Sequence, residues 1–480
     1  MKKISLIFAV LAVVSTSTFA GGLLTNTNQN VAFLRNPARD AVIGIDGVYT
    51  NPAGVAFLQQ GFHLSLNWQA AMQKREMTST FLPYINNAND AALTKDFVGE
   101  AKAPVIPSVQ AAYVINDKWS VSGQFAIGGG GGKCEFDNGL PMFEELIGGA
   151  VAQNGGTSYA LNQQLTGKQY FFGLQLGATY RLAENFSVFG GVRGVLASCG
   201  YEGAINGIKA NGLTAAEYSA LSQQAAAGAQ QAADAAAKYA AAGMAAEAAQ
   251  YAAMAETLKG QAVQAGTVAA MIGDYNLDCS QSGFGITPII GLDWNLGKLN
   301  LAAKYEFRTK IELENESTNS ANVDALMPAY ADGGKVRSDI PALLTLGAQY
   351  QFTDAFRAMA GFHYYWDKDA KGSPIQKGDN TWEALLGIEW DVNDKIMLSM
   401  GGQRTDYNFD DADMSDINFN TPNFAICLGG AYKFSEKMKL NVGYMHSFYE
   451  DHKVTNATSG IARNYTRKND VVGVSLDIAF

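Results

Sequence analysis

The stretch PALLTLGAQYQF (341–352) changes the character of its side chains at every second residue. One face of an extended chain would carry Leu344, Leu346, Ala348, Tyr350 and Phe352, whereas the other would carry mostly Thr, Gly and Gln. Three further runs follow the same pattern: KLNLAAKYEFRTKIE (298–312), TWEALLGIEWDV (381–392) and VVGVSLDIAF (471–480). A period of two is typical of β-strands with two different faces, so it predicts an all-β fold.

The length of these runs indicates where the strands lie. Strands of globular proteins usually have about five or six residues, whereas a tilted strand that crosses a bilayer needs about 9–11. Aromatic residues near the ends of the apolar faces fit the aromatic girdles of a membrane barrel. A soluble β-sandwich would also alternate, but it would need neither such long strands nor a large exposed aromatic face. We therefore predict a transmembrane antiparallel β-barrel.

The connections between the strands alternate in length. Short polar turns such as Asn116–Asp117 and Asn393–Asp394 are followed by long segments such as 83–103, 129–167 and 201–281. This is the pattern of bacterial outer-membrane barrels, which have short turns at one end and long loops at the other. The spacing predicts about fourteen strands between residues 61 and 480, an even number that puts both ends on the side of the short turns.

The N-terminus and the composition restrict the location and the chemistry. Residues 1–20 have two lysines, a short apolar core and a small residue at Ala20, which is the layout of a secretory signal peptide. The net charge of -10 argues against a nucleic-acid partner. The sequence contains neither a GxSxG nor an HExxH motif, and its four cysteines lack metal-binding spacing. We therefore expect no enzymatic activity, no cofactor and no metal.

Two segments do not follow the strand pattern. Residues 21–60 precede the first strand and could fold into the barrel as a plug, which we call the hatch. Residues 214–271 are rich in Ala, Glu, Gln and Lys, so they predict one or two helices in an external loop, with a break near Gly243. This insertion is either a partner-binding cap or a solvated low-complexity segment. Cys199 and Cys279 flank it and are candidates for a disulfide.

Several motifs resemble the FadL family, the outer-membrane channels for long-chain fatty acids and other hydrophobic compounds. NPAG (51–54) resembles that family's hatch, and PSVQAAYVINDKWSVSGQFAIG (107–128) resembles its second and third strands. YEFRTKIEL (305–313), the hairpin DIPALLTLGAQYQFTDAFRAMAGFHYYWDKD (339–369), NTWEALLGIEW (380–390) and the terminal Phe480 are also similar. The likeness covers most of the mature chain except the Ala-rich insertion. Asp367 departs from it, because the family usually has a small residue at that position.

The resemblance implies a fourteen-stranded barrel with an N-terminal hatch, embedded in the bacterial outer membrane as a monomer. It also implies a path for the ligand: capture outside, movement into the lumen when the hatch rearranges, and sideways exit into the outer-membrane lipid through a gap at a kink in the third strand. Within the hatch, Asn51 and Pro52 are candidates for the turn that seats the plug.

The run IGGGGGK (127–133) allows three interpretations. A phosphate-binding loop requires a Gly at Ile127 and a hydroxyl residue at Cys134, so that motif does not fit. A flexible linker is compatible with five consecutive glycines. The third interpretation is a local break in the barrel wall, because glycine weakens strand pairing. In that case Gly128, Gly129, Gly130, Gly131 and Gly132 would form the lateral gap, with Phe125 and Ile127 at its edge.

The candidate ligand site follows from the charges that face the lumen. A fatty acid needs an apolar trough and a cation for its carboxylate. Arg193, Lys304 and Arg308 are candidates for that cation, although they could instead pair with acidic neighbours such as Glu306. We predict passive transport of hydrophobic small molecules, with long-chain fatty acids as the favoured ligand. The alternatives are a general polar porin and a surface adhesin that uses the Ala-rich loop.

Overall fold

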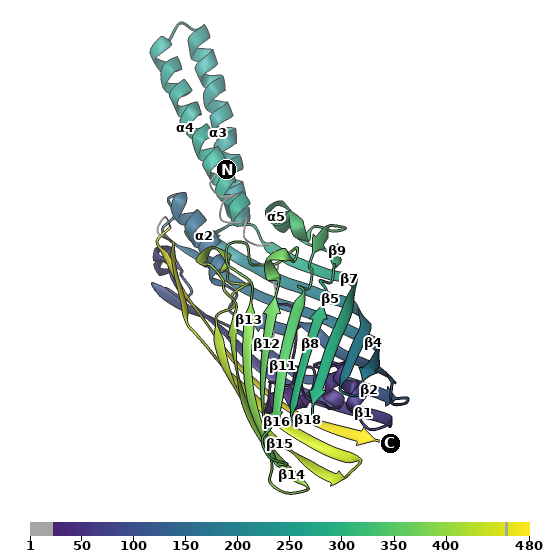
Figure 1. Cartoon of the computed structure of the whole chain (residues 1–480). Coiled ribbons are helices and arrows are strands. Elements are labelled where there is room, and N and C mark those ends of the chain that lie inside the picture. Colours follow the sequence, from purple (N-terminus) through teal and green to yellow (C-terminus); the bar gives the residue numbers. More distant parts are fainter. Residues whose placement is uncertain (1–22, 457–458) are drawn as a thin grey trace.

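The computed structural model describes residues 23–456 and 459–480. The expected signal peptide, residues 1–20, lies outside this part of the chain. The described residues form a single antiparallel sheet that closes on itself, because the first strand, β1 (Gly61–Thr80), pairs with both β2 (Thr94–Val114) and the last strand, β18 (Ile461–Ala479). Figure 1 shows the resulting barrel, with the C-terminus at the end of the short turns. We call this the turn end and the opposite end the loop end.

The barrel wall has fourteen strands within the described residues, although eighteen strand segments are present. Three wall strands are interrupted and consist of two segments each, namely β8–β9, β10–β11 and β16–β17, and β6 (Leu213–Thr214) is a short addition to β5. The number predicted from the sequence is confirmed. The other segments are β3 (Trp119–Phe136), β4 (Tyr159–Ala183), β5 (Phe186–Ala210), β7 (Tyr275–Leu296), β8 (Leu299–Glu306), β9 (Glu312–Ser317), β10 (Lys335–Arg337), β11 (Leu343–Gln351), β12 (Phe356–Tyr365), β13 (Trp382–Asp391), β14 (Ile396–Asp406), β15 (Asn423–Ser435), β16 (Met438–Tyr449) and β17 (His452–Asn456).

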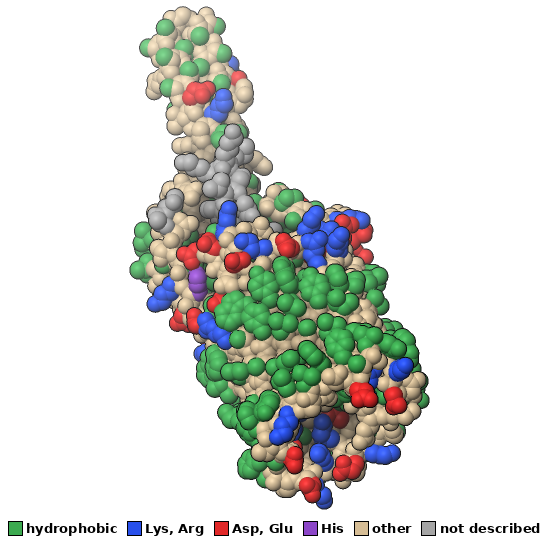
Figure 2. Space-filling model, in the orientation of Figure 1, with side chains coloured by type: hydrophobic (Ala, Val, Ile, Leu, Met, Phe, Trp, Pro, Cys, Tyr) green, Lys and Arg blue, Asp and Glu red, His purple; other side chains and the backbone are tan. Residues whose placement is uncertain are grey.

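The two faces of the wall differ as the sequence pattern predicts. On β13, Leu386 and Trp390 are 66% and 50% exposed, whereas Glu383 and Glu389 are 0% and 2% exposed. The apolar side chains therefore point outward and the acidic ones point into the lumen. On the face of the barrel seen in Figure 2, the outward-facing apolar side chains form a broad band, with charged side chains gathered near its two ends.

Several wall strands extend further toward the loop end than the sequence predicts. Strand β2 begins at Thr94, within the expected loop 83–103, and β5 and β7 extend into the expected loop 201–281. Residues 129–167 contain the end of β3, the start of β4 and the helix α2 (Pro141–Gln153). In these extensions polar residues such as Asn162 and Gln163 replace the apolar face, so the period-two signal disappears although the strand continues.

The hatch lies inside the barrel, toward the turn end (Figure 1). It contains the short helix α1 (Val31–Arg35) and the 3-10 helices η1 (Ile45–Val48) and η2 (Gly54–Phe57). Nearly all of its described side chains are buried, including polar ones such as Asn26 and Gln29. These side chains fill the lumen that the closed sheet encloses.

The Ala-rich insertion forms a helical hairpin that projects from the loop end (Figure 1). Its helices are α3 (Ala215–Ala241) and α4 (Ala245–Met271), and Gly243 adopts a left-handed φ of 76° in the turn between them. This confirms the predicted helices and the break near Gly243. Thr214 and Glu217 form a reciprocal capping box that starts α3.

Short helices in the remaining loops complete the loop end. They are α5 (Ala321–Leu326), η3 (Leu82–Asn86), η4 (Pro328–Tyr330), η5 (Asp367–Asp369) and η6 (Asp411–Asp413). Among the residues described, none of the helices has both the length and the apolar character that a membrane span requires.

Candidate functional site: the glycine run, the hatch and the outer pocket

The pairing between β2 and β3 is interrupted at the glycine run. The register runs from Val114↔Ser120 to Ser108↔Ala126, stops, and resumes only at Ala101↔Cys134. Residues 102–107 of β2 and 127–133 of β3 therefore do not pair with each other. On the other side of β3, the register with β4 shifts twice, between Ile127 and Gly129 and between Gly129 and Gly132. The chain continues as a strand but departs from the regular ladder.

The backbone conformation explains why glycine occupies this run. Gly130 and Gly132 have φ angles of 83° and 73°, which side chains with a Cβ rarely adopt. A Cβ at Gly129 would lie 2.0 Å from the carbonyl oxygen of Leu24, and one at Gly130 would lie 2.4 Å from the carbonyl oxygen of Gln169. Gly128 is different, because its Cβ would have no neighbour closer than 3.7 Å.

The start of the hatch occupies the place where the wall is interrupted. The backbone N–H of Asn26 donates to the carbonyl of Gly128 at 3.0 Å, and its side-chain amide donates to the carbonyl of Ile127 at 3.1 Å. On the opposite side, the Ser108 hydroxyl donates to the carbonyl of Gln29 at 2.7 Å. The hatch thus takes up backbone groups of β3 that β2 leaves without a strand partner. Ile127 is buried, whereas Phe125 is 43% exposed on the outer face.

The NPAG segment fixes the other end of the hatch. The Asn51 side chain accepts the N–H of Gly54 at 3.1 Å and donates to the Asp293 carboxylate of β7 at 2.5 Å. The carbonyl of Pro52 accepts a hydrogen bond from the Thr179 hydroxyl of β4 at 2.9 Å. Asn51 therefore shapes the local turn and, together with Pro52, connects it to two wall strands.

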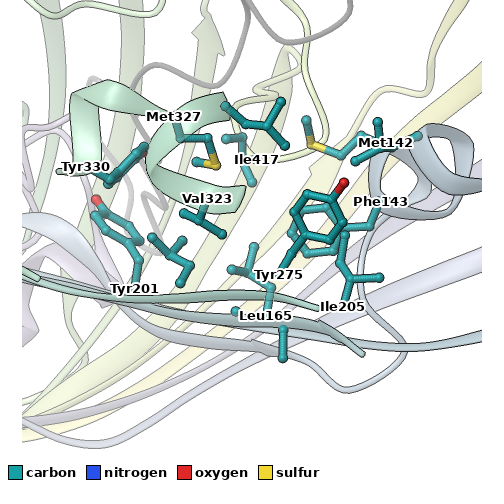
Figure 3. A pocket seen from close by; sticks show the side chains of 15 residues that line it. Met142, Phe143, Leu165, Tyr201, Ile205, Tyr275, Val323, Met327, Tyr330 and Ile417 are labelled. Atoms are coloured by element: carbon teal, nitrogen blue, oxygen red, sulfur yellow. The ribbon is translucent and has the colours of Figure 1, made fainter. Parts of the chain in front are cut away.

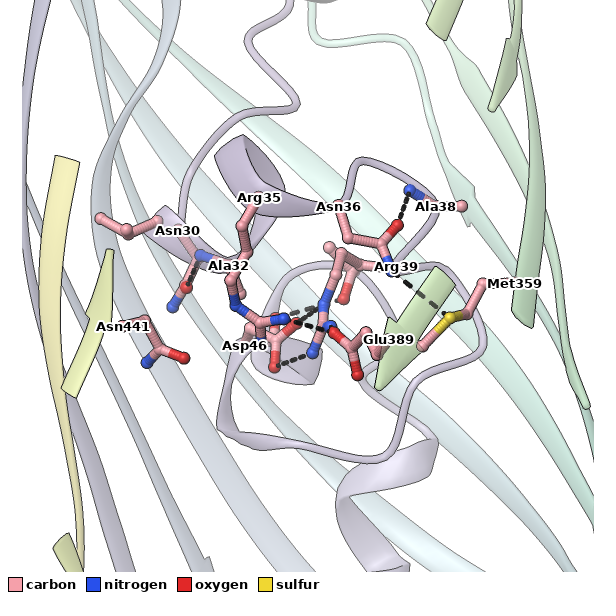
Figure 4. Close-up of polar contacts among 12 residues, drawn as sticks. Asn30, Ala32, Arg35, Asn36, Ala38, Arg39, Asp46, Met359, Glu389 and Asn441 are labelled. Atoms are coloured by element: carbon pink, nitrogen blue, oxygen red, sulfur yellow. Dashed lines mark hydrogen bonds and ion pairs between the residues drawn. The ribbon is translucent and has the colours of Figure 1, made fainter. Parts of the chain in front are cut away.

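A cluster of buried charges joins the centre of the hatch to the wall (Figure 4). Arg35 and Arg39 both pair with the Glu389 carboxylate of β13, and Arg39 also donates to Asp46 within the hatch at 2.7 Å. Burial from water opposes the ionisation of Asp46, but the Arg39 guanidinium outweighs it and holds the pKa of Asp46 below its usual value. Both carboxylates of this cluster, Glu389 and Asp46, therefore face a guanidinium, and the pairs with Glu389 hold the hatch to the wall.

The three cations proposed to bind a carboxylate already have partners. Arg193 and Lys304 lie 2.6 Å and 2.8 Å from the Glu306 carboxylate, and Lys304 also donates to the carbonyl of Tyr49 in the hatch at 2.8 Å. Arg308 contacts the carbonyl of Asp369 and lies 3.7 Å from the Asp339 carboxylate. The structure therefore joins Arg193 and Lys304 in one buried group and places Arg308 among the loops.

The candidate disulfide is not present, because Cys199 and Cys279 are free thiols in the structure. Cys199 is in register with Gln281, and Cys279 is in register with Tyr201. The two cysteines are thus diagonal neighbours on β5 and β7 and not direct cross-strand partners. The sequence places both at the base of the insertion but does not reveal this offset of two residues.

An apolar pocket lies at the loop end, between α2, α5 and the extended parts of the wall strands (Figure 3). Figure 3 shows apolar side chains from these elements converging on one space. No lysine, arginine, aspartate or glutamate is found among its described lining residues. Residues that carry this lining include Phe143, Ile205, Tyr275, Val323, Met327 and Ile417. We call this the outer pocket.

Sequence reasoning missed the outer pocket and the partners of the glycine run. The pocket combines residues from six separate segments, none of which contains a recognisable motif. Leu24, Asn26 and Gln29 lie in LLTNTNQN (23–30), a stretch whose only signal is its many amide side chains. Amides are suited to the inside of a barrel, where they satisfy polar groups of the wall. Metal binding was not expected, and no group of three potential metal ligands occurs in the described residues.

Comparison with known proteins identifies the fold. No protein-family model and no curated protein sequence matches the chain. Among solved structures, the chain is similar to a Pseudomonas aeruginosa FadL homologue, with a TM-score of 0.63 and 14% identity over 96% of this chain and 100% of that one. It is also similar to the Pseudomonas putida toluene transporter TodX, with a TM-score of 0.56 and 14% identity over 96% of this chain and 99% of that one.

A third similar structure is the Ralstonia pickettii toluene transporter TbuX, with a TM-score of 0.53 and 14% identity over 94% of this chain and 98% of that one. These likenesses extend along nearly the whole chain and include the hatch. They confirm the barrel that the sequence motifs imply. The chain therefore has the fold of the FadL-type outer-membrane channels.

Proposed function

We propose that the protein is a passive channel for hydrophobic small molecules in a bacterial outer membrane. The observation that carries this proposal is a continuous apolar cluster that connects the outer pocket to the interruption of the wall. At one end of the cluster, Ile417 lines the outer pocket. At the other end, Leu24 and Phe171 lie against Gly129. A hydrophobic molecule needs such a lining on its way from water to lipid.

The hatch favours this function over a general porin. A porin conducts through a polar, water-filled lumen, whereas here the buried residues of the hatch fill the lumen and are bonded to the wall. We infer that ligand entering from the outer pocket leaves sideways between β2 and β3 once residues 23–30 move away from Gly128 and Gly129. Rearrangement of these residues alone would open the interruption without breaking the rest of the barrel.

The chemistry of the ligand follows from the outer pocket and from similar proteins. The lining favours apolar molecules or the apolar chain of an amphipathic one. TodX and TbuX are named as toluene transporters, and the other similar structure is named as a FadL homologue. We propose long-chain fatty acids as the ligand, as the sequence motifs suggest, with neutral hydrocarbons as the second class to test.

Uptake of labelled oleate in cells without their own fatty-acid channel tests the proposal. We expect uptake above that of the empty vector. Leu326→Glu places a charge in the lining of the outer pocket on a half-buried residue, and we expect it to lower uptake by about fivefold or more because a buried charge is unfavourable. The neighbouring Ala325→Glu adds the same charge on an exposed residue outside the lining and should leave uptake unchanged.

Two results would contradict the proposal. The first is a folded barrel in the outer membrane that takes up neither oleate nor labelled toluene above the empty vector. The second is a high and steady ion conductance of the wild-type protein in a planar bilayer, which would indicate an open polar pore.

A further inference from the structure

Most of the buried lysines and arginines among the described residues lie beside a carboxylate. Five buried lysines and arginines each lie within 4.0 Å of an acidic side chain: Arg35, Arg39, Lys95, Arg193 and Lys304. Arg75 on β1 is 0% exposed, yet it forms no ion pair with any residue in the described ranges 23–456 and 459–480. A buried charge without a counter-charge is unfavourable, so this exception calls for an explanation.

The present partners of Arg75 are weak ones. Its Nη2 donates to the carbonyls of Ile417 and Phe419 at 3.3 Å and 3.4 Å, and its guanidinium carbon lies 4.4 Å from the centre of the Phe419 ring. Its Nε and Nη1 atoms have no hydrogen-bond partner among the described residues. A guanidinium presents five N–H groups in a planar fork that fits the two oxygens of a carboxylate.

A second arginine lies directly beside the first. Arg467 on β18 is in register with Arg75, and it is 2% exposed. It donates to the side-chain oxygen of Asn420 and, at 3.5 Å, to the same carbonyl of Phe419, and its guanidinium lies 4.9 Å from the ring of Tyr449. Two like charges that face each other across neighbouring strands repel. An anion bound beside both guanidiniums would relieve this repulsion and would supply acceptors for Arg75.

The position of Arg75 connects it to the proposed ligand path. Ile417, whose carbonyl accepts from Arg75, lines the outer pocket with its side chain. Arg75 is in register with Gly99 of β2, close to Ala101, and the pair Ala101↔Cys134 is the last one before the interruption of the wall. The arginine therefore lies between the outer pocket and the interruption.

We propose that Arg75, assisted by Arg467, binds the carboxylate of an amphipathic ligand while its apolar chain lies along the cluster between the outer pocket and Leu24. This inference rests on the proposed function and specifies the class of ligand as hydrophobic carboxylic acids. The structure argues against Arg193 and Lys304 for this task, because Glu306 neutralises both. The competing explanation is that Arg75 only holds residues 417–419 in place through their carbonyls.

Binding of cis-parinaric acid and its methyl ester to the purified full-length barrel in detergent separates these explanations. The two fluorescent ligands share the same chain and differ in charge. We expect Arg75→Gln to weaken binding of the acid by about tenfold, equivalent to about 1.4 kcal/mol, and to change binding of the ester by less than about twofold. Arg75→Lys keeps the charge and should retain part of the preference for the acid.

Arg404→Gln is the matched control, because Arg404 is an arginine of β14 that forms a partly exposed ion pair with Glu450. It should leave the binding of both ligands unchanged. The shift in apparent mass of the unheated barrel on a gel shows that each variant is folded.

Each result has a distinct meaning. If Arg75→Gln binds the acid as tightly as the wild type does, Arg75 does not bind the carboxylate and the inference is overturned. The proposed channel still stands in that case, provided that the wild type binds both ligands. If Arg75→Gln weakens binding of the acid and of the ester equally, Arg75 only holds residues 417–419 in place. This result also overturns the carboxylate site. If the wild type binds neither ligand, both this inference and the proposed function fail.

Discussion

Two neighbouring parts of the wall show different ways of satisfying the backbone. Strands β4 and β5 are paired from Tyr159↔Ala210 to Ala183↔Phe186, with only local irregularities. Strands β2 and β3 leave residues 102–107 and 127–133 unpaired with each other. The hatch supplies donors to the carbonyls of Ile127 and Gly128 at this place. A strand in the wall of a membrane barrel can thus lose its neighbour where another internal partner replaces it.

The comparison of these two strand pairs indicates that the wall between β2 and β3 is only as stable as the hatch that covers it. The backbones of β4 and β5 pair directly with each other along nearly their whole length, whereas the interruption is closed by a segment from the start of the chain. Changes that loosen the hatch should therefore affect β2 and β3 and leave β4 and β5 intact. Three predictions test this contrast, in order of decreasing expected effect.

The largest effect is expected from Glu389→Gln. The Glu389 carboxylate is shared by Arg35 and Arg39 of the hatch and by Arg357 of β12. Its removal takes away the counter-charge of buried Arg35, whereas Arg39 and Arg357 keep Asp46 and Asp391. We expect the hatch to be destabilised by about 3–5 kcal/mol. Trypsin should then cut after Arg35 and Arg39 much faster than in the wild type, while the barrel stays folded.

Asp391→Asn is the matched control for this variant. Within the described part of the chain, Asp391 forms an ion pair only with Arg357, at 2.7 Å, and it is partly exposed, so its loss should hardly change the cleavage of the hatch. Equal protection of the hatch in Glu389→Gln and the wild type would show that the buried ion pairs do not hold it.

A smaller effect is expected from Gly129→Ala. The added Cβ would meet the Leu24 carbonyl at 2.0 Å, so the start of the hatch must move away from β3 at a cost of about 1–3 kcal/mol. We expect a higher basal conductance in a planar bilayer, because the interruption is less well covered. Gly128→Ala is the matched control, since its Cβ has space. If both variants have the same conductance, the contact between the hatch and Gly129 does not close the wall.

The smallest effect on the wall is expected from the protonation of Asp367, which lies in a loop over the mouth of the barrel. Burial raises the pKa of Asp367 to about 6, even though the Thr381 N–H donates to its carboxylate at 3.1 Å. The native state therefore prefers protonated Asp367, and the loop should lose up to about 3 kcal/mol of stability as the pH rises from 4 through 6. Hydrogen exchange of the Thr381 amide, corrected for its intrinsic pH dependence, measures this change.

Asp367→Asn should remove the pH dependence and leave the wall strands unaffected. If the exchange of Thr381 shows the same pH dependence in this variant as in the wild type, another group is responsible. If Asp367→Asn changes the pairing of β2 with β3, the loops and the wall are not independent of each other.

Local sequence pattern predicts the barrel because each wall strand carries its own signal. The inward positions of Glu383 and Glu389 and the outward positions of Leu386 and Trp390 follow from alternation alone. The strand extensions toward the loop end lack this signal, since their outward face carries polar residues there instead of the apolar ones that face lipid. The start of β4, around Asn162 and Gln163, is an example.

The candidate site was predicted less completely, because it depends on contacts between distant segments. The five glycines indicate an unusual place in the wall, but no local pattern shows that Leu24 and Asn26 lie against them. By contrast, the sequence offers Glu306 as the alternative partner of Arg193 and Lys304, and the structure places both beside its carboxylate. Arg75 resembles any other inward residue of β1 until its missing counter-charge is seen in the structure.

The helical hairpin has a geometric consequence for what reaches the mouth of the barrel. Each of its helices has 27 residues, so at 1.5 Å per residue the hairpin extends about 40 Å from its base. A molecule the size of an antibody or a phage fibre that approaches from the loop end meets the tip around Gly243 first. A ligand of a few dozen atoms passes beside the hairpin without contact. The tip of the hairpin, and not the mouth of the barrel, is therefore the part of the protein that a large molecule approaching from this side touches first.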